Sequence, residues 1–203
     1  MLASITPLGE RARGSRWGVT VVFFAAGSVV AAVAVGALTG ELGRLTWPGP
    51  SGRWEPRLAV LAVALAAAIA LDAGAGAGAG GIRIPSVRRQ VNEDWLREYR
   101  GWVYGLGFGL QLGLGVSTIV TTAAVYVTLV AAWLSGDPLL GAAITGAFGA
   151  ARAASLLAGV GATRPDRLVA LHARMAAWRR PGRLLAIASQ GALLVIAFLG
   201  FAG

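Results

Sequence analysis

Long apolar stretches separated by short polar, arginine-rich segments make up most of this chain of 203 residues. A helix needs about 20 predominantly apolar residues to cross the hydrocarbon core of a bilayer, and five stretches come close to that length. This pattern predicts an all-α protein, a polytopic transmembrane helical bundle that forms a single integral membrane domain over residues 1–203. The five predicted spans cover residues 17–38, 58–79, 101–134, 139–160 and 184–202.

The third predicted span, residues 101–134, is uncharged and longer than one simple crossing requires. As a continuous helix it would measure about 50 Å, against a hydrocarbon core of about 30 Å. Its first third is rich in glycine, which costs about 1 kcal/mol relative to alanine inside a helix. Two interpretations stay open: a glycine-broken or re-entrant beginning before a regular helix over 116–133, or one long tilted helix whose glycines permit close packing. The glycines are Gly105, Gly107, Gly109, Gly113 and Gly115.

The polar segments between the spans carry turn and interface signals. In residues 82–100, the apolar positions after Pro85 follow roughly helical spacing, which predicts a short amphipathic helix at the membrane interface. The alanine–glycine repeat before it, residues 73–81, is either the weakly helical inner end of the second span or a flexible link. Residues 161–183 are basic and partly amphipathic, and the single histidine, His172, falls in this predicted loop.

The arginines indicate how the chain is oriented. All 18 basic residues are arginine, and fourteen of them flank the predicted inner ends of the spans, against three at the outer ends. Arginine excess marks the cytoplasmic side, so we expect a cytoplasmic N-terminus and an external C-terminus. The alanine, glycine and arginine bias is typical of a GC-rich genome, and we expect a bacterial plasma (inner) membrane. The net charge of +9 then encodes topology, and no nucleic-acid partner is expected.

The composition limits the chemistry that the chain can perform. It contains no cysteine, which excludes disulfides, thiol relays and thiolate metal sites within the chain. One histidine cannot build a histidine-rich metal site. The sequence has no nucleophile-elbow, zinc-protease or phosphate-loop motif and no paired inward carboxylates. We therefore expect neither an enzyme nor a bound cofactor or metal.

Two ionisable residues, Asp72 and Arg152, lie inside predicted spans, where such residues are rare and are functional candidates. Each is about 12 Å from the inner boundary, and equal depth with opposite charge predicts a pair. Gln111 is at about 15 Å on the third span. The predicted binding site for a solute consists of Arg152, Gln111, Asp72, Thr118, Thr121 and Thr122.

Structural roles compete with this prediction. Asp72 would lie at the interface if the alanine–glycine repeat is outside the membrane. An Asp72–Arg152 pair could serve only to fix helix register. The threonines could donate hydrogen bonds to their own helix, and Gln111 could join two helices.

The segment YGLGFGLQLGLG, its threonine-rich continuation and the later GAAITGAFGAAR ending at Arg152 resemble the transmembrane domain of the CcdA/DsbD cytochrome-biogenesis family, within the LysE-like transporter group. The resemblance implies two inverted three-helix repeats with facing broken helices. That family passes electrons through a membrane cysteine beside a proline in each broken helix. This chain has no cysteine, and no proline between Gly115 and Thr118, so thiol electron transfer is excluded. Five spans also fall one short of two three-helix repeats.

Two functions follow as expectations. The first is a small inner-membrane transporter or exporter of a small polar or anionic solute, in which Arg152 neutralises the solute and Asp72 couples protons. The alternative is a non-transporting membrane subunit or assembly factor of a larger complex. Besides the lipid bilayer, either protein could bind a second copy of itself or a partner membrane subunit.

Overall fold

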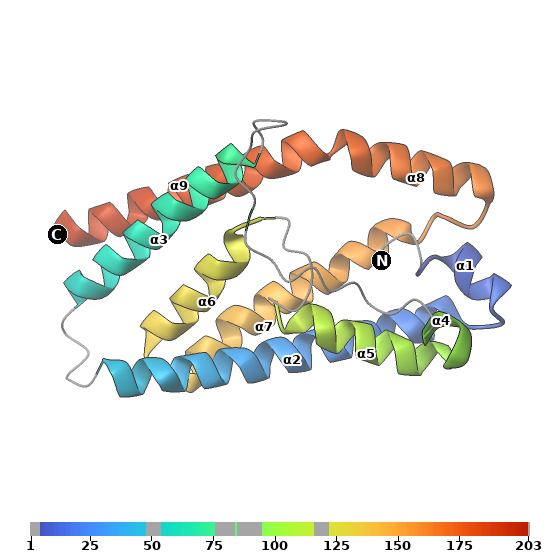
Figure 1. Ribbon diagram of the computed structural model, residues 1–203, viewed down its shortest axis with the longest axis horizontal. Coiled ribbons are helices and arrows are strands. Elements are labelled where there is room, and N and C mark those ends of the chain that lie inside the picture. Colours follow the sequence, from blue (N-terminus) through green and yellow to red (C-terminus); the bar gives the residue numbers. More distant parts are fainter. Residues whose placement is uncertain (1–4, 48–53, 76–83, 85–94, 116–121, 203) are drawn as a thin grey trace.

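The computed structural model describes residues 5–47, 54–75, 84, 95–115 and 122–202, and every regular element in these ranges is a helix (Figure 1). The all-α prediction is therefore confirmed. The elements are α1 (Pro7–Ala12), α2 (Trp17–Thr46), α3 (Trp54–Gly74), α4 (Trp95–Glu98), α5 (Gly101–Gly113), α6 (Ala124–Ser135), α7 (Pro138–Ala154), the 3-10 helix η1 (Ser155–Gly159), α8 (Pro165–Ala177) and α9 (Arg179–Ala202).

Within the described part of the chain, four helices are long and apolar enough to cross a membrane, and α6 is a shorter apolar helix. The third predicted span is divided between α5 and α6. The first predicted span continues past residue 38, because α2 ends only at Thr46. The second ends earlier than expected, at Gly74, and residues 76–79 lie outside the described residues. The four long apolar segments are Trp17–Thr46, Glu55–Gly74, Pro138–Gly159 and Arg179–Gly200.

Helix α5 lies parallel to the first half of α2, and glycine makes this contact possible. The α5 glycines at 101, 105, 109 and 113 recur every fourth residue and so share one face. A Cβ atom at Gly105 would lie 2.6 Å from the Thr20 carbonyl oxygen, and one at Gly109 would collide with the Phe24 carbonyl. The glycine-rich segment is therefore a regular helix that packs closely, as one of the two sequence interpretations expected.

The third span is nevertheless discontinuous, as the other interpretation expected, but the discontinuity follows the glycine-rich helix. Helix α5 ends at Gly113, and Gly115 has φ +76, in the left-handed region that favours glycine. Helix α6 begins at Ala124. The expected start of a regular helix at 116 lies outside the described residues.

Helix α7 runs antiparallel to α2 along its second half. Gly36 and Gly141 face each other so closely that neither could carry a Cβ atom without a collision. The Thr145 hydroxyl donates to the Ala32 carbonyl at 2.7 Å, and the Ser28 hydroxyl donates to the Gly149 carbonyl at 3.0 Å. Together α2, α5 and α7 form a unit held by backbone-to-backbone contact.

Helices α3 and α9 pack side by side as a second unit, and α3 meets the first unit chiefly through α6 (Figure 1). Leu65 and Ala68 of α3 are buried against Ala123 and Val127 at the beginning of α6. Helix α6 also contacts α2 and α7. It is therefore the element that joins the two units.

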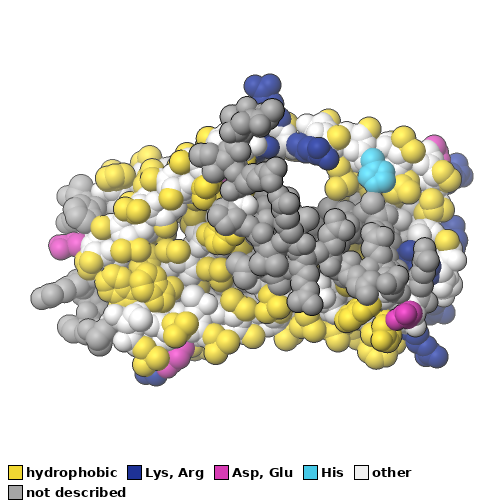
Figure 2. Space-filling model, in the orientation of Figure 1, with side chains coloured by type: hydrophobic (Ala, Val, Ile, Leu, Met, Phe, Trp, Pro, Cys, Tyr) yellow, Lys and Arg dark blue, Asp and Glu magenta, His cyan; other side chains and the backbone are white. Residues whose placement is uncertain are grey.

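The predicted interfacial helix over 82–100 is described only at its end, where α4 covers Trp95–Glu98, and residues 85–94 lie outside the described residues. The predicted loop around His172 is instead the exposed helix α8, none of whose residues is buried. Pro165 at its first turn fits a helix start. Figure 2 shows arginine side chains along α8 and near its junction with α9, whereas hydrophobic side chains spread over α3, α6 and α2.

Candidate functional site

The end of α5, residues 112–115, and the start of α6, residues 122–124, are where the polar side chains Arg152, Asp72 and Gln190 bind, and we call these two facing ends the helix break. Ending one helix and starting another exposes carbonyl groups at the first end and N–H groups at the second. Inside a bilayer these groups need partners from the protein. Two charged residues from other helices each bind one such backbone group.

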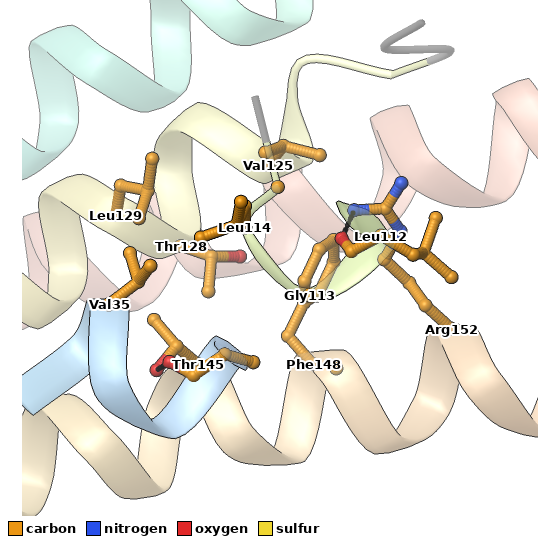
Figure 3. A pocket seen from close by; sticks show the side chains of 13 residues that line it. Val35, Leu112, Gly113, Leu114, Val125, Thr128, Leu129, Thr145, Phe148 and Arg152 are labelled. Atoms are coloured by element: carbon orange, nitrogen blue, oxygen red, sulfur yellow. Dashed lines mark hydrogen bonds between the residues drawn. The ribbon is translucent and has the colours of Figure 1, made fainter. Parts of the chain in front are cut away.

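Arg152 of α7 binds the end of α5. One of its guanidinium N–H groups donates to the Leu112 carbonyl at 3.0 Å, drawn as the dashed line in Figure 3. The guanidinium carbon also lies 5.7 Å from the centre of the Phe148 ring. The carbonyl end of a helix carries partial negative charge, so an arginine there is stabilising.

Asp72 of α3 binds the start of α6 and is only 1% exposed. Its Oδ1 accepts the Ala123 backbone N–H at 2.8 Å, and its Oδ2 accepts the Thr122 hydroxyl at 2.7 Å. Asp72 thus acts as a helix N-cap that comes from another helix, and its charge suits the positive end of the α6 dipole.

Gln190 of α9 is the third hydrogen-bond donor to Asp72, because its side-chain amide donates to Oδ2 at 2.9 Å. Gln190 is itself buried, and its Oε1 accepts no hydrogen bond from any described residue. One buried acceptor therefore stays available beside the carboxylate. The sequence analysis missed Gln190, although an amide side chain in the middle of the fifth predicted span was a usable signal.

The predicted direct pair between Asp72 and Arg152 is not formed. Within the described ranges the ion pairs are Arg13–Glu10 and Arg44–Glu41. Asp72 is on the α3–α9 unit and Arg152 is on the α2–α5–α7 unit, so each charge reaches a different end of the helix break. The sequence placed Asp72 and Arg152 at equal depth in two spans. It could not reveal that the two ends of α5 and α6 lie between these side chains and bind them instead.

The remaining predicted site residues, Thr122, Gln111, Thr118 and Thr121, differ in where they lie relative to Asp72 and Arg152. Thr122 is brought to Asp72, as the hydrogen bond above shows. Gln111 is half-buried on α5 and is not among the residues that line the cavity beside Arg152. Thr118 and Thr121 lie outside the described residues.

A small cavity lies beside the guanidinium of Arg152, under the last turn of α5 (Figure 3). Its volume of about 20 Å³ is enough for one water molecule. The hydroxyls of Thr145 and Thr128, which also line it, donate to backbone carbonyls of their surroundings. Among the described residues that line the cavity, only Arg152 is charged, and it gives this lining a positive character.

A second buried polar cluster, at the start of the chain, was also missed from the sequence. Glu10 of α1 is fully buried and accepts the Thr20 hydroxyl at 2.6 Å and the Tyr104 hydroxyl at 2.5 Å. Arg13 pairs with its other oxygen at 2.6 Å. Burial lowers the pKa of Arg13, but the hydrogen bonds to Glu10 and Tyr104 and the charge of Glu10 together outweigh burial and raise the pKa above its ordinary value.

These features define an all-α bundle with four apolar helices long enough to cross a membrane, in which the buried Asp72 and the half-buried Arg152 bind the ends of two successive helices. Comparisons with protein-family models, with curated proteins and with solved structures find no match. The resemblance to the CcdA/DsbD and LysE-like group therefore stays a prediction.

Proposed function

We propose that the protein is a small membrane transporter for a small polar or anionic solute and that the helix break is its binding region. The observation that carries this proposal is the capping of the two ends of the break by opposite charges from two different helices. Discontinuous helices in transporters present their dipole ends and free backbone groups to substrates and coupling ions.

The cost of this arrangement supports a functional role. A continuous third helix would satisfy the carbonyl of Leu112 and the N–H of Ala123 internally, and it would need neither charge. Charged side chains inside a membrane are expensive, and such residues commonly mark solute or ion pathways. A break that needs Asp72 and Arg152 to stabilise it is thus more readily explained by binding than by packing.

The lining of the cavity favours an anion. Arg152 uses one N–H group on Leu112, and a guanidinium has five such groups. The two lining hydroxyls donate elsewhere, so Arg152 would supply the charged recognition. A volume of about 20 Å³ admits an atom-sized species, and a larger solute would require α6 to move away from α5.

The division into two units suggests how such a movement could occur. The α2–α5–α7 unit is locked by glycine contacts, whereas the α3–α9 unit reaches it chiefly through α6. Asp72 is the link between α3 and the beginning of α6. Protonation of Asp72 would weaken its hold on the Ala123 N–H, so a proton could control the position of α6. Gln190 donates to this carboxylate, and its Oε1 accepts no hydrogen bond from any described residue.

The test is transport by the full chain in proteoliposomes, using radiolabelled chloride, sulfate and phosphate as probes. We expect uptake of at least one of these anions, and Arg152→Leu should abolish it while the variant still folds. Arg167→Leu, which removes the same charge from the exposed helix α8, is the matched control and should transport normally. Equal flux in the Arg152→Leu variant and the control would overturn the proposal.

A second candidate function, a non-transporting membrane subunit, is favoured by α8. This helix has no buried residue, so a partner could cover it. Stable co-purification with one partner that is lost on substitution of α8 residues, together with tolerance of Arg152→Leu, would favour this function.

A further inference from the structure

A second and much larger cavity, of about 480 Å³, lies at the beginnings of α2 and α5, away from the helix break. It is formed by the connection from α1 to α2, residues 13–16, and by residues 98–102 around the start of α5. These two segments are far apart in the sequence and meet because α2 and α5 run parallel. A Cβ atom on Gly101 would lie 2.6 Å from the Thr20 hydroxyl, so the two helices begin in contact.

Among the described residues, three arginines and one carboxylate line this cavity: Arg13, Arg16, Arg100 and Glu98. Arg13 is already engaged by Glu10. Arg16 and Arg100 are exposed, and neither forms an ion pair with any residue that the structure describes. The cavity therefore has a net positive lining with two arginine side chains available to an anion.

The backbone adds to this positive character. Arg16 and Arg100 are the N-cap residues of α2 and α5, and neither side chain caps its helix. Both helices thus begin at the edge of the same cavity. Helix N-termini bind phosphate groups well, and arginine presents a fork of donors that matches a phosphate.

One side of the cavity continues into an exposed apolar surface. Val19 and Trp102 line the cavity and are exposed, and the Phe23 ring lies 5.8 Å from the Trp102 ring one turn along α2. A free phosphate ester would leave this surface uncovered, whereas a lipid would bring both a phosphate and an acyl chain. Tryptophan at this position also suits the level of lipid headgroups.

We propose that this cavity binds the phosphate group of an anionic phospholipid. Arg16 and Arg100 contact the phosphate, and an acyl chain lies along Val19, Phe23 and Trp102. Glu98 disfavours a more highly charged ligand and so favours a phosphodiester. This site is separate from the helix break and does not depend on transport.

The experiment is native mass spectrometry of the detergent-purified full chain with added dioleoyl phosphatidylglycerol, dioleoyl phosphatidylcholine or glycerol 3-phosphate. We expect the double variant Arg16→Gln/Arg100→Gln to lower the affinity for phosphatidylglycerol about tenfold. The matched control is Arg179→Gln/Arg180→Gln, which removes two exposed arginines at the beginning of α9 and should retain the lipid. Circular dichroism verifies that both double variants are folded.

The relative affinities for the two lipids and for glycerol 3-phosphate support or contradict the proposed site. Phosphatidylglycerol should bind more tightly than phosphatidylcholine, and excess glycerol 3-phosphate should not displace it. Trp102→Ser should weaken lipid binding without creating affinity for glycerol 3-phosphate. Equal losses in the two double variants, equal binding of the two lipids, or displacement by glycerol 3-phosphate would overturn it. Because no flux is measured, this result is independent of the transport test.

Discussion

Asp72 and Arg152 do not touch each other but hold the two ends of one interrupted helix. Asp72 accepts the Ala123 N–H at the start of α6, and Arg152 donates to the Leu112 carbonyl at the end of α5. Each charge has the sign that its helix end requires.

Substitution of Asp72 should destabilise the bundle strongly. Asp72→Ala leaves the Ala123 N–H, the Thr122 hydroxyl and the Gln190 amide without their acceptor. We expect a loss of about 2–4 kcal/mol in the free energy of unfolding, measured by reversible unfolding in mixed micelles. Asp137→Ala is the control, because Asp137 is also a carboxylate N-cap but its hydrogen bonds are exposed. It should cost about 1 kcal/mol, and an equal cost for both variants would contradict the role assigned to Asp72.

Gln190 should contribute to the free energy of unfolding only through its hydrogen bond to Asp72. Gln190→Leu removes one donor to the carboxylate and should cost about 1–2 kcal/mol. In a double-mutant cycle with Asp72→Ala the two costs should not add, because the residues share one hydrogen bond. Ser189→Ala, whose hydroxyl bonds to its own helix, should be additive with Asp72→Ala. Additivity for Gln190 as well would show that its bond to Asp72 contributes nothing.

Two glycine-to-alanine substitutions should change the stability of the bundle in opposite directions. Gly109→Ala places a methyl group against the Phe24 carbonyl, so α5 must move away from α2, and we expect a loss of about 1–3 kcal/mol. Gly191→Ala in α9 has open space at its Cβ position and should gain up to about 1 kcal/mol from helix propensity. Thermal unfolding of both variants in the same detergent measures the difference. A gain at Gly109 would mean that the close contact of α2 and α5 does not form.

The Glu10 cluster should tie α1 to the bundle. Glu10→Gln replaces a buried carboxylate with an amide that cannot form an ion pair with Arg13, and because Arg13 is partly exposed we expect a loss of about 1–3 kcal/mol in the free energy of unfolding. Hydrogen–deuterium exchange should increase over residues 5–13 and at the beginning of α5, because the single amide oxygen of glutamine cannot replace both carboxylate oxygens that accept from Arg13 and Tyr104. Glu98→Gln, at an exposed position of α4, should leave exchange there unchanged. Unchanged exchange in Glu10→Gln would show that apolar contacts alone hold α1.

Several elements could be predicted from the sequence because the signal is local. Membrane-length apolar runs predict α2, α3, α7 and α9, and their composition needs no knowledge of neighbours. The placement of Asp72 and Arg152 inside such runs was equally visible. The four-residue spacing of the α5 glycines also predicts a close-packing face, although not which helix packs on it.

The tertiary structure decided which groups those residues meet. Hydrophobic periodicity gives the face that a helix buries, but the partner on that face depends on how all helices are arranged. That is why Asp72 was expected to meet Arg152 and instead binds Thr122, Ala123 and Gln190. It is also why Glu10, isolated in a polar segment, gave no sign that Thr20 and Tyr104 would enclose it. The sequence by itself determined which segments are apolar helices and where charges enter them, and the packing of α2, α5 and α7 against α3, α6 and α9 decided what those charges bind.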